Sequence, residues 1–290
     1  MDKNTKRATL CALLAAALYA ISAPCSKLLL RGLTPTMMAA FLYLGAGIGM
    51  AAVGLLRSRG RKLDAALRLT RKELPYTAAM IVLDIAAPAF LMVGLTMTTA
   101  ANASLLNNFE IVATAIIALL FFKERITKRL WLAIGLITLS SVILSFEDMS
   151  SLSFSSGSLF VLLACICWGL ENNCTRALSQ KDPLQIVVIK GLGSGAGALL
   201  IALMMGDRLG DLPYIVAALV LGFVAYGLSI FFYVRAQRDL GAAKTSTYYA
   251  VAPFIGVALS LVVFRAFPSI SFFIALAIMG IGAYCASTAT

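Results

Sequence analysis

The sequence contains no histidine, and only 13% of its 290 residues are charged. Without histidine, zinc proteases of the His-Glu-x-x-His type and phosphotransfer through an imidazole are excluded. The Gly-x-Ser-x-Gly turn that presents a nucleophilic serine is also missing. Asp84 and Glu110 are a conceivable catalytic pair of acids, but the sequence contexts usual for such sites are missing as well. We therefore expect neither an enzyme nor a metal site or bound cofactor.

Polar residues are too scarce for a water-soluble domain. The residues AVILMFWYC make up 61% of the chain, and the mean hydropathy is +0.93. Soluble domains carry about 25% charged residues, roughly twice the share found here. A helix that crosses ~30 Å of hydrocarbon needs about 20 residues, so the chain is long enough for ten crossings with short loops. The composition predicts an all-α integral membrane protein in the lipid bilayer of the cell inner (plasma) membrane.

Ten apolar runs are separated by charges or by clusters of proline and glycine. We predict ten transmembrane helices over residues 8–29, 35–56, 74–97, 101–122, 128–146, 157–178, 184–206, 212–235, 240–264 and 268–287. The first run follows basic residues, as in a signal peptide, but it continues past Cys25, so we expect no cleavage. All six cysteines lie in apolar runs, which favours packing roles over disulfides or zinc ligation.

The net charge of +11 has an uneven distribution along the chain. With the N-terminus inside, 18 of the 24 Lys and Arg residues fall in the N-terminal tail and the even-numbered loops, and only 3 fall in the odd-numbered loops. Basic residues accumulate in cytoplasmic loops, so both termini are predicted to be cytoplasmic. The charge then orients the chain in the bilayer, and we expect no nucleic-acid partner.

The two halves of the chain repeat one another. Gly45-x-Gly47-x-Gly49 recurs as Gly193-x-Gly195-x-Gly197. No strand precedes these glycines, so close helix packing is favoured over a dinucleotide site. We predict two five-helix repeats, residues 1–148 and 149–290, which insert upside down relative to each other because each has an odd number of spans. Inverted repeats of this kind build secondary transporters that hold a substrate near the membrane midplane.

Ionisable side chains inside a span are costly, so each one is a functional candidate. Asp84 and Glu110 lie near the middle of the third and fourth spans, and Glu171 lies on the sixth. Asn107 shares a helical face with Glu110. Proton coupling without histidine would use a carboxylate, and Glu110 is the first candidate. The alternatives are that these acids only tie helices together through Lys or Arg, and that transport is facilitated diffusion without a coupling ion.

Three further groups of residues inside the spans are candidates for functional roles. Side chains that suit a pocket are Tyr19, Trp168, Tyr248 and Lys244. Bases suited to gating or ion pairing are Lys27, Arg176 and Lys190. For Lys27 and Arg176, which lie near helix ends, snorkelling to the headgroups is the alternative. Prolines where we expect kinks or hinges are Pro24, Pro88 and Pro253.

Several stretches resemble one known family. They are Pro24-x-x-Lys27, the run from Phe121 to Thr127 (FFKERIT), the run from Trp168 to Arg176 (WGLENNCTR), and Pro253. With the two five-helix halves, these motifs resemble the EamA-like ten-helix branch of the drug/metabolite transporter superfamily, and the resemblance implies export. The chain departs from the family pattern where Ile111 replaces a usual proline and where Ala266 stands opposite Glu124, so the halves are asymmetric.

Taken together, these features predict a secondary active or facilitative transporter that works as a monomer. Its small-molecule substrates would be amphipathic metabolites such as amino acids, exported by alternating access, with the proton as candidate coupling ion. Efflux of cationic drugs and flipping of a lipid-linked sugar remain alternatives. A channel is less favoured, because an internal repeat builds its site within one chain whereas pore-lining rings usually come from an oligomer.

Overall fold

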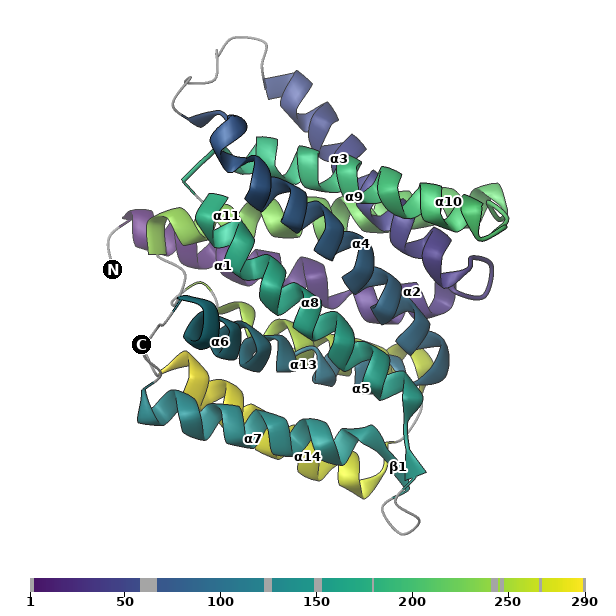
Figure 1. The fold of residues 1–290 in the computed structure, drawn as a ribbon. Helices are drawn as coiled ribbons and strands as arrows, with labels where there is room; N and C mark the ends of the chain where they lie inside the picture. Colours follow the sequence, from purple (N-terminus) through teal and green to yellow (C-terminus); the bar gives the residue numbers. More distant parts are fainter. Residues whose placement is uncertain are drawn as a thin grey trace.

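The computed structural model describes residues 3–57, 67–122, 127–148, 153–178, 180–240, 245, 248–265 and 268–288. The structure is a bundle of helices, and the two chain termini lie near each other on one side of the molecule (Figure 1). The helices are α1 (Lys3–Ala20), α2 (Ser22–Leu29), α3 (Pro35–Arg57), α4 (Leu74–Met97), α5 (Ala100–Leu106), α6 (Phe109–Phe122), α7 (Lys128–Ser145), α8 (Ser156–Leu178), α9 (Pro183–Met204), α10 (Leu212–Leu221), α11 (Ser229–Leu240), α13 (Ala252–Phe264) and α14 (Ile270–Ser287).

Eight helical stretches of the described chain are long and apolar enough to cross a membrane. They coincide with the first eight predicted spans, and the shorter apolar helices Ala252–Phe264 and Ile270–Ala286 lie where the ninth and tenth were predicted. Large apolar side chains such as Leu120 and Val262 are exposed, whereas Asp84 is buried. This distribution is the reverse of that in a soluble protein, and the chain is a helical multi-pass membrane protein.

Local sequence signals explain several helix boundaries. The side chain of Asp182 accepts a hydrogen bond from the backbone N–H of Gln185, and Pro183 occupies the first turn of α9. An acidic N-cap followed by proline is a favourable helix start. Helix α13 has a common C-terminal signal: it ends at Arg265, which adopts the left-handed conformation with a φ of 50°.

Two predicted spans are each divided into two helices, which corrects the prediction of single helices over 8–29 and 101–122. The first span is interrupted at Ile21, between α1 and α2. The ring of Pro24 clashes with the carbonyl of the residue four positions earlier, Ala20, which is the last residue of α1. The other span is interrupted at Asn107–Asn108, between α5 and α6, where the backbone N–H of Glu110 bonds to the carbonyl of Asn107. Asparagine competes for backbone hydrogen bonds and is a poor residue for a helix interior.

The other two prolines have different surroundings. Pro88 lies inside α4, which continues from Leu74 to Met97. Pro253 lies in the first turn of α13 and follows a turn at Ala250–Val251, so it begins a helix. The eighth span contains a π-helical segment, η3 (Gly222–Leu228), between α10 and α11. Such segments interrupt the regular helical hydrogen bonding and are frequent near functional sites.

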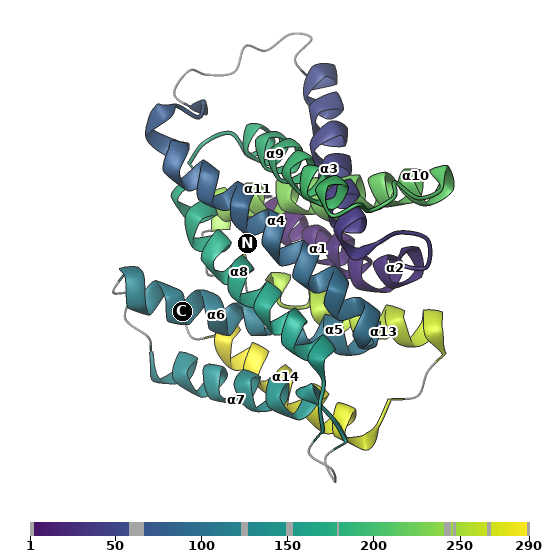
Figure 2. The same ribbon diagram turned by 45° about the vertical axis from the view of Figure 1, so that its right-hand side comes forward.

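Most of the packing joins one half of the chain to the other. The most extensive contacts pair α4 with α8, α3 with α9, and α7 with α14, and α1 also packs along α11 (Figures 1 and 2). The glycines contribute to the α3–α9 crossing, because a Cβ added to Gly47 would lie 2.5 Å from the backbone nitrogen of Leu192. This observation supports the reading of the glycine repeat as a close helix contact.

Loops from the two halves are joined at both ends of the bundle. At one end, Asp207, which follows α9, accepts two hydrogen bonds. One comes from Thr34 just before α3 (2.8 Å), and the other comes from Thr36 in the first turn of α3 (2.5 Å). At the other end, Lys181 before α9 lies 3.4 Å from Glu73, which belongs to a short 3₁₀ helix, η2 (Arg71–Glu73), ahead of α4. The segment between α7 and α8 forms a small antiparallel pair of strands, β1 (Phe146–Asp148) and β2 (Ser153–Phe154).

Candidate functional site

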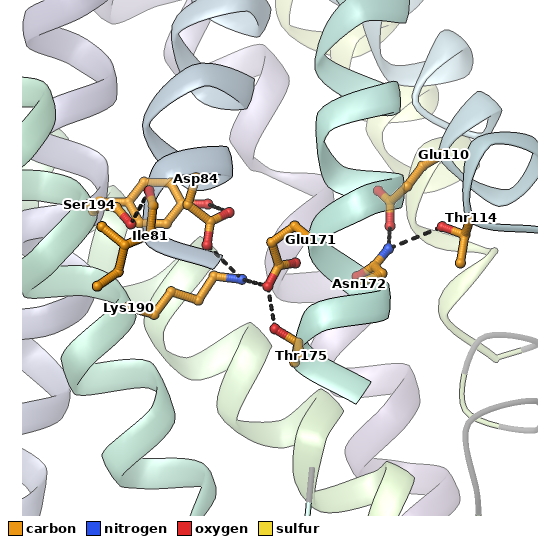
Figure 3. A network of polar contacts seen from close by, with 10 residues as sticks. Ile81, Asp84, Glu110, Thr114, Glu171, Asn172, Thr175, Lys190 and Ser194 are labelled. Atoms are coloured by element: carbon orange, nitrogen blue, oxygen red, sulfur yellow. Dashed lines mark hydrogen bonds and ion pairs between the residues drawn. The ribbon is translucent and has the colours of Figure 1, made fainter. Parts of the chain in front are cut away.

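A buried ionic cluster lies where α4, α8 and α9 meet (Figure 3). The Nζ of Lys190 lies 3.0 Å from Oδ2 of Asp84 and 2.9 Å from Oε1 of Glu171. All three side chains are buried, at 1% to 5% exposure of each residue. Tyr43 donates a hydrogen bond of 2.8 Å to the other oxygen of Asp84, and Thr175 donates to Glu171. The lysine thus connects one acid from each half of the chain.

Glu110 forms a second polar group beside this cluster. Its Oε1 accepts a hydrogen bond of 2.5 Å from the side-chain amide of Asn172, which also contacts the hydroxyl of Thr114 at 3.4 Å. Glu110 lies in the first turn of α6, where the helix dipole favours a negative charge. Figure 3 shows Glu171 and Asn172 projecting from neighbouring positions of α8 in opposite directions, the former toward Lys190 and the latter toward Glu110. Helix α8 therefore carries both polar groups.

A cavity of about 70 Å³ connects these two groups. The polar side chains that line it, among the described residues, are Glu110, Glu171, Asn172, Thr175 and Lys190. The aromatic ones are Tyr19, Tyr43, Trp168, Tyr226, Tyr233 and Tyr249. Tyr19 holds the aromatic cluster together, because its ring centroid lies 5.8 Å from that of Tyr226 and 5.9 Å from that of Tyr249. The cavity is thus a polar centre with aromatic walls.

The charges around the cavity do not balance. In the part of the chain that the structure describes, three carboxylates, Asp84, Glu110 and Glu171, meet one amino group, that of Lys190. Unpaired charge in a low-dielectric interior is strongly unfavourable. The site can therefore take up positive charge, either as a proton or as a cationic group of a ligand.

The structure brings together several residues singled out in the sequence. Those that line the cavity are Glu110, Glu171, Trp168, Tyr19 and Lys190, and Asp84 binds Lys190 from behind it. Lys190, an ion-pair candidate from the sequence, contacts two acids. Tyr248 is not among the described lining residues, whereas its neighbour Tyr249 is. Lys244 lies outside the described residues.

Other candidates lie away from the cavity. Asn107 and Pro253 line a separate space of about 10 Å³ near the break between α5 and α6. We expected Asn107 and Glu110 to share one face of a continuous helix. The interruption shows that this expectation is wrong, because α5 ends before Asn107 and α6 begins at Phe109. Lys27 donates to the backbone carbonyls of Leu95 and Thr98 (2.7 Å for the latter) at the C-terminal end of α4, and so caps that helix. Arg176 lies exposed in the last turn of α8.

Sequence reasoning missed Tyr43 and Asn172. Tyr43 satisfies the criterion that identified the other aromatics, a phenol inside a span, and could have been found in the same way. Asn172 is adjacent to Glu171 and was treated as part of a motif only. Among the described residues, no group of three or more Cys, Asp or Glu side chains is placed to hold a metal ion.

Comparisons with known proteins agree on the kind of protein. An uncharacterized transporter of Methanothermobacter thermautotrophicus is 28% identical over 266 residues, which cover 85% of this chain and 76% of that relative. The uncharacterized transporter YyaM of Bacillus subtilis is 23% identical over 240 residues, 79% of this chain and 77% of its own. A solved crystal structure at 19% identity has the same fold, with a TM-score of 0.68 over 96% of both chains.

The EamA-like transporter family matches the chain twice, over residues 6–146 and 155–288. These two stretches cover nearly all of the ten apolar segments, and each includes one of the acids that bind Lys190. The match agrees with the helical membrane fold. The chain belongs to the EamA-like transporter family.

Proposed function

We propose that this family member is a secondary transporter for small amphipathic molecules that carry a cationic nitrogen. It would work by alternating access in the cell inner membrane, with the halves 1–148 and 149–290 moving against each other. The observation that carries this proposal is the cavity lined by Glu110, Glu171 and Lys190, with Asp84 bound to the lysine from behind; its lining residues come from both halves. The site lies near the middle of α4 and α9, as expected for a transporter built from inverted repeats.

The chemistry of the cavity favours a cation over other ligands. A positively charged nitrogen is attracted by the faces of tyrosine and tryptophan rings and by the carboxylate of Glu110. An amino acid would add a further carboxylate to a site where Asp84 and Glu171 already share one lysine and Glu110 is paired with an amide. Lys190 would have to leave Asp84 or Glu171 to bind it. Of the substrate classes predicted from the sequence, organic cations therefore fit better than amino acids.

The present arrangement supports a mechanism with a closed intermediate. A cavity of about 70 Å³ holds about two water molecules at ~30 Å³ each, whereas small-molecule sites usually enclose about 300 Å³ or more. Binding a metabolite therefore requires the aromatic walls to move apart. The loop contacts of Asp207 at one end and Glu73 at the other join the two halves, so breaking either contact would favour opening on that side.

Glu110 is the proposed coupling acid, because its one described hydrogen-bond donor is a neutral amide and it lines the cavity. We expect Glu110→Gln to reduce proton-coupled flux at least about tenfold while the protein stays folded. The measurement uses vesicles that contain a pH-sensitive dye, with an outward proton gradient and external tetramethylammonium. Asp211→Asn, an exposed acid ahead of α10, is the matched control and should retain the wild-type rate.

An undiminished rate in Glu110→Gln would exclude this residue as the coupling acid. A wild-type protein that exchanges protons for amino acids but for no tetraalkylammonium ion would contradict the cationic substrate class.

The orientation with both termini in the cytoplasm is also proposed. The position of both chain ends on one side supports an even number of crossings (Figure 1). In a cysteine-free background, a cysteine at Arg68, between α3 and α4, should react with an impermeant maleimide only from the cytoplasmic side. A cysteine at Arg208, between α9 and α10, should react only from outside. The opposite pattern would reverse the topology.

A further inference from the structure

The ammonium group of Lys190 is bound in the way that a ligand ammonium would be. Its nitrogen lies about 3 Å from two carboxylates that come from different helices, Asp84 on α4 and Glu171 on α8. Tyr43 donates a hydrogen bond to the other oxygen of Asp84, and Thr175 donates to the same Glu171 oxygen that contacts Lys190. The two acids therefore form a site for one positively charged nitrogen, and the amino group of Lys190, on α9, occupies it.

A second position for a positive charge lies in the same cavity, at Glu110. This acid and Glu171 both line the cavity, Glu171 pointing toward Lys190 and Glu110 bonding Asn172 on the other side of α8 (Figure 3). Among the described residues Glu110 has no cationic partner, only the amide of Asn172. The cavity thus contains two positions for cations, of which one is filled by the protein itself.

We propose that Lys190 determines the charge of the substrate. Its Nζ occupies the position between Asp84 and Glu171, so the wild-type cavity accepts a ligand with one cationic nitrogen, at Glu110, and offers no advantage to a ligand with two. Removing the amino group opens the second position, and the cavity then favours an α,ω-diamine that spans both. This inference rests on the proposed function, because it takes Glu110 as the position of the substrate cation.

A test of the role of Lys190 needs a variant that lacks its amino group but stays folded. Lys190→Gln alone leaves two buried acids without a counter-charge, which destabilises the fold. The double variant Lys190→Gln with Asp84→Asn keeps the net charge of the wild-type cluster, one negative charge, and leaves Glu171 free to bind. Lys128→Gln removes an exposed lysine at the start of α7 instead and serves as the matched control.

The experiment measures binding to purified protein by calorimetry, with thermal unfolding as a second readout. The probes are butylammonium and the diammonium ions of 1,2-diaminoethane to 1,6-diaminohexane. For the wild type and Lys128→Gln, the best diamine should bind within about threefold of butylammonium. For the double variant, it should bind at least tenfold more tightly than butylammonium. Adding Glu171→Gln or Glu110→Gln to the double variant should remove this preference.

The outcomes distinguish the proposed role of Lys190 from the proposed function, in which Glu110 is the position of the substrate cation. An unchanged diamine preference in the folded double variant overturns the role of Lys190, while loss of butylammonium binding in Glu110→Gln still supports the proposed function. A wild type that binds no butylammonium, with binding gained only in the double variant, supports Lys190 as the occupant and contradicts Glu110 as the substrate position. A diamine preference that survives Glu171→Gln overturns the inference.

Discussion

Lys190→Met is expected to lower the free energy of unfolding by about 3–5 kcal/mol, the cost of removing one partner from a buried ion pair. The variant keeps the length of the side chain but leaves Asp84 and Glu171 facing each other, each at most 3% exposed. In detergent, the midpoint of thermal unfolding, followed by tryptophan fluorescence, should fall by several degrees or more. The loss of stability is large because two buried carboxylates are left without a counter-charge, in addition to the lost attraction between them and the lysine.

The triple variant Lys190→Met, Asp84→Asn and Glu171→Gln tests this explanation. It has no buried charge in the cluster, so most of the lost stability should return. Lys27→Met is the control, because its amino group bonds to backbone carbonyls and is only partly buried, and it should shift the midpoint far less. If the triple variant were as unstable as Lys190→Met, the ionic explanation would be wrong.

Gly47→Leu is expected to separate α3 from α9 and to cost about 3 kcal/mol or more, at the upper end of overpacking effects. A Cβ at position 47 would lie 2.5 Å from the backbone nitrogen of Leu192, and one at Gly191 would lie 2.4 Å from that of Gly47. Backbone atoms in two packed helices cannot give way as a side-chain end can. We expect loss of the monodisperse peak in size-exclusion chromatography and a lower unfolding midpoint.

Gly135→Leu makes the same chemical change at a position where it should be tolerated. The added Cβ would have no atom within 4 Å, because Gly135 lies on the exposed face of α7. A normal elution profile for Gly135→Leu together with an aggregated Gly47→Leu would locate the effect at the α3–α9 crossing. Equal behaviour of both variants would contradict that reading.

Hydropathy was sufficient to place the membrane helices, because lipid imposes one requirement on every span, a long apolar run. It could not place the interruption at Asn107–Asn108, since mean hydropathy does not report backbone hydrogen bonding. The face shared by Asn107 and Glu110 was inferred for a continuous helix and was lost at that interruption. Glu110 was singled out because a carboxylate within a span needs a polar environment wherever the helix bends, and in the structure it lines the cavity.

The partners of each candidate were harder to predict than the candidates. Neighbouring helix positions differ by about 100° around the axis, so a choice between Tyr248 and Tyr249 depends on a rotation that composition does not fix. The pairing of Lys190 with Asp84 joins residues of different halves, and no local pattern contains that information. The sequence shows that Tyr43, Asp84 and Lys190 each lie inside a span, but only the fold shows that the three side chains are in contact.

The interleaved packing of the two halves has a consequence for synthesis of the protein. Helices α3 and α4 leave the ribosome long before their partners α9 and α8, and roughly a hundred residues separate Asp84 from Lys190. At ~5–20 residues per second, the acid waits about 5–20 s for its lysine. The early helices must therefore be shielded by the insertion machinery or by lipid until the later ones arrive, and a chain stopped after α7 would lack the neighbours that bury its polar side chains.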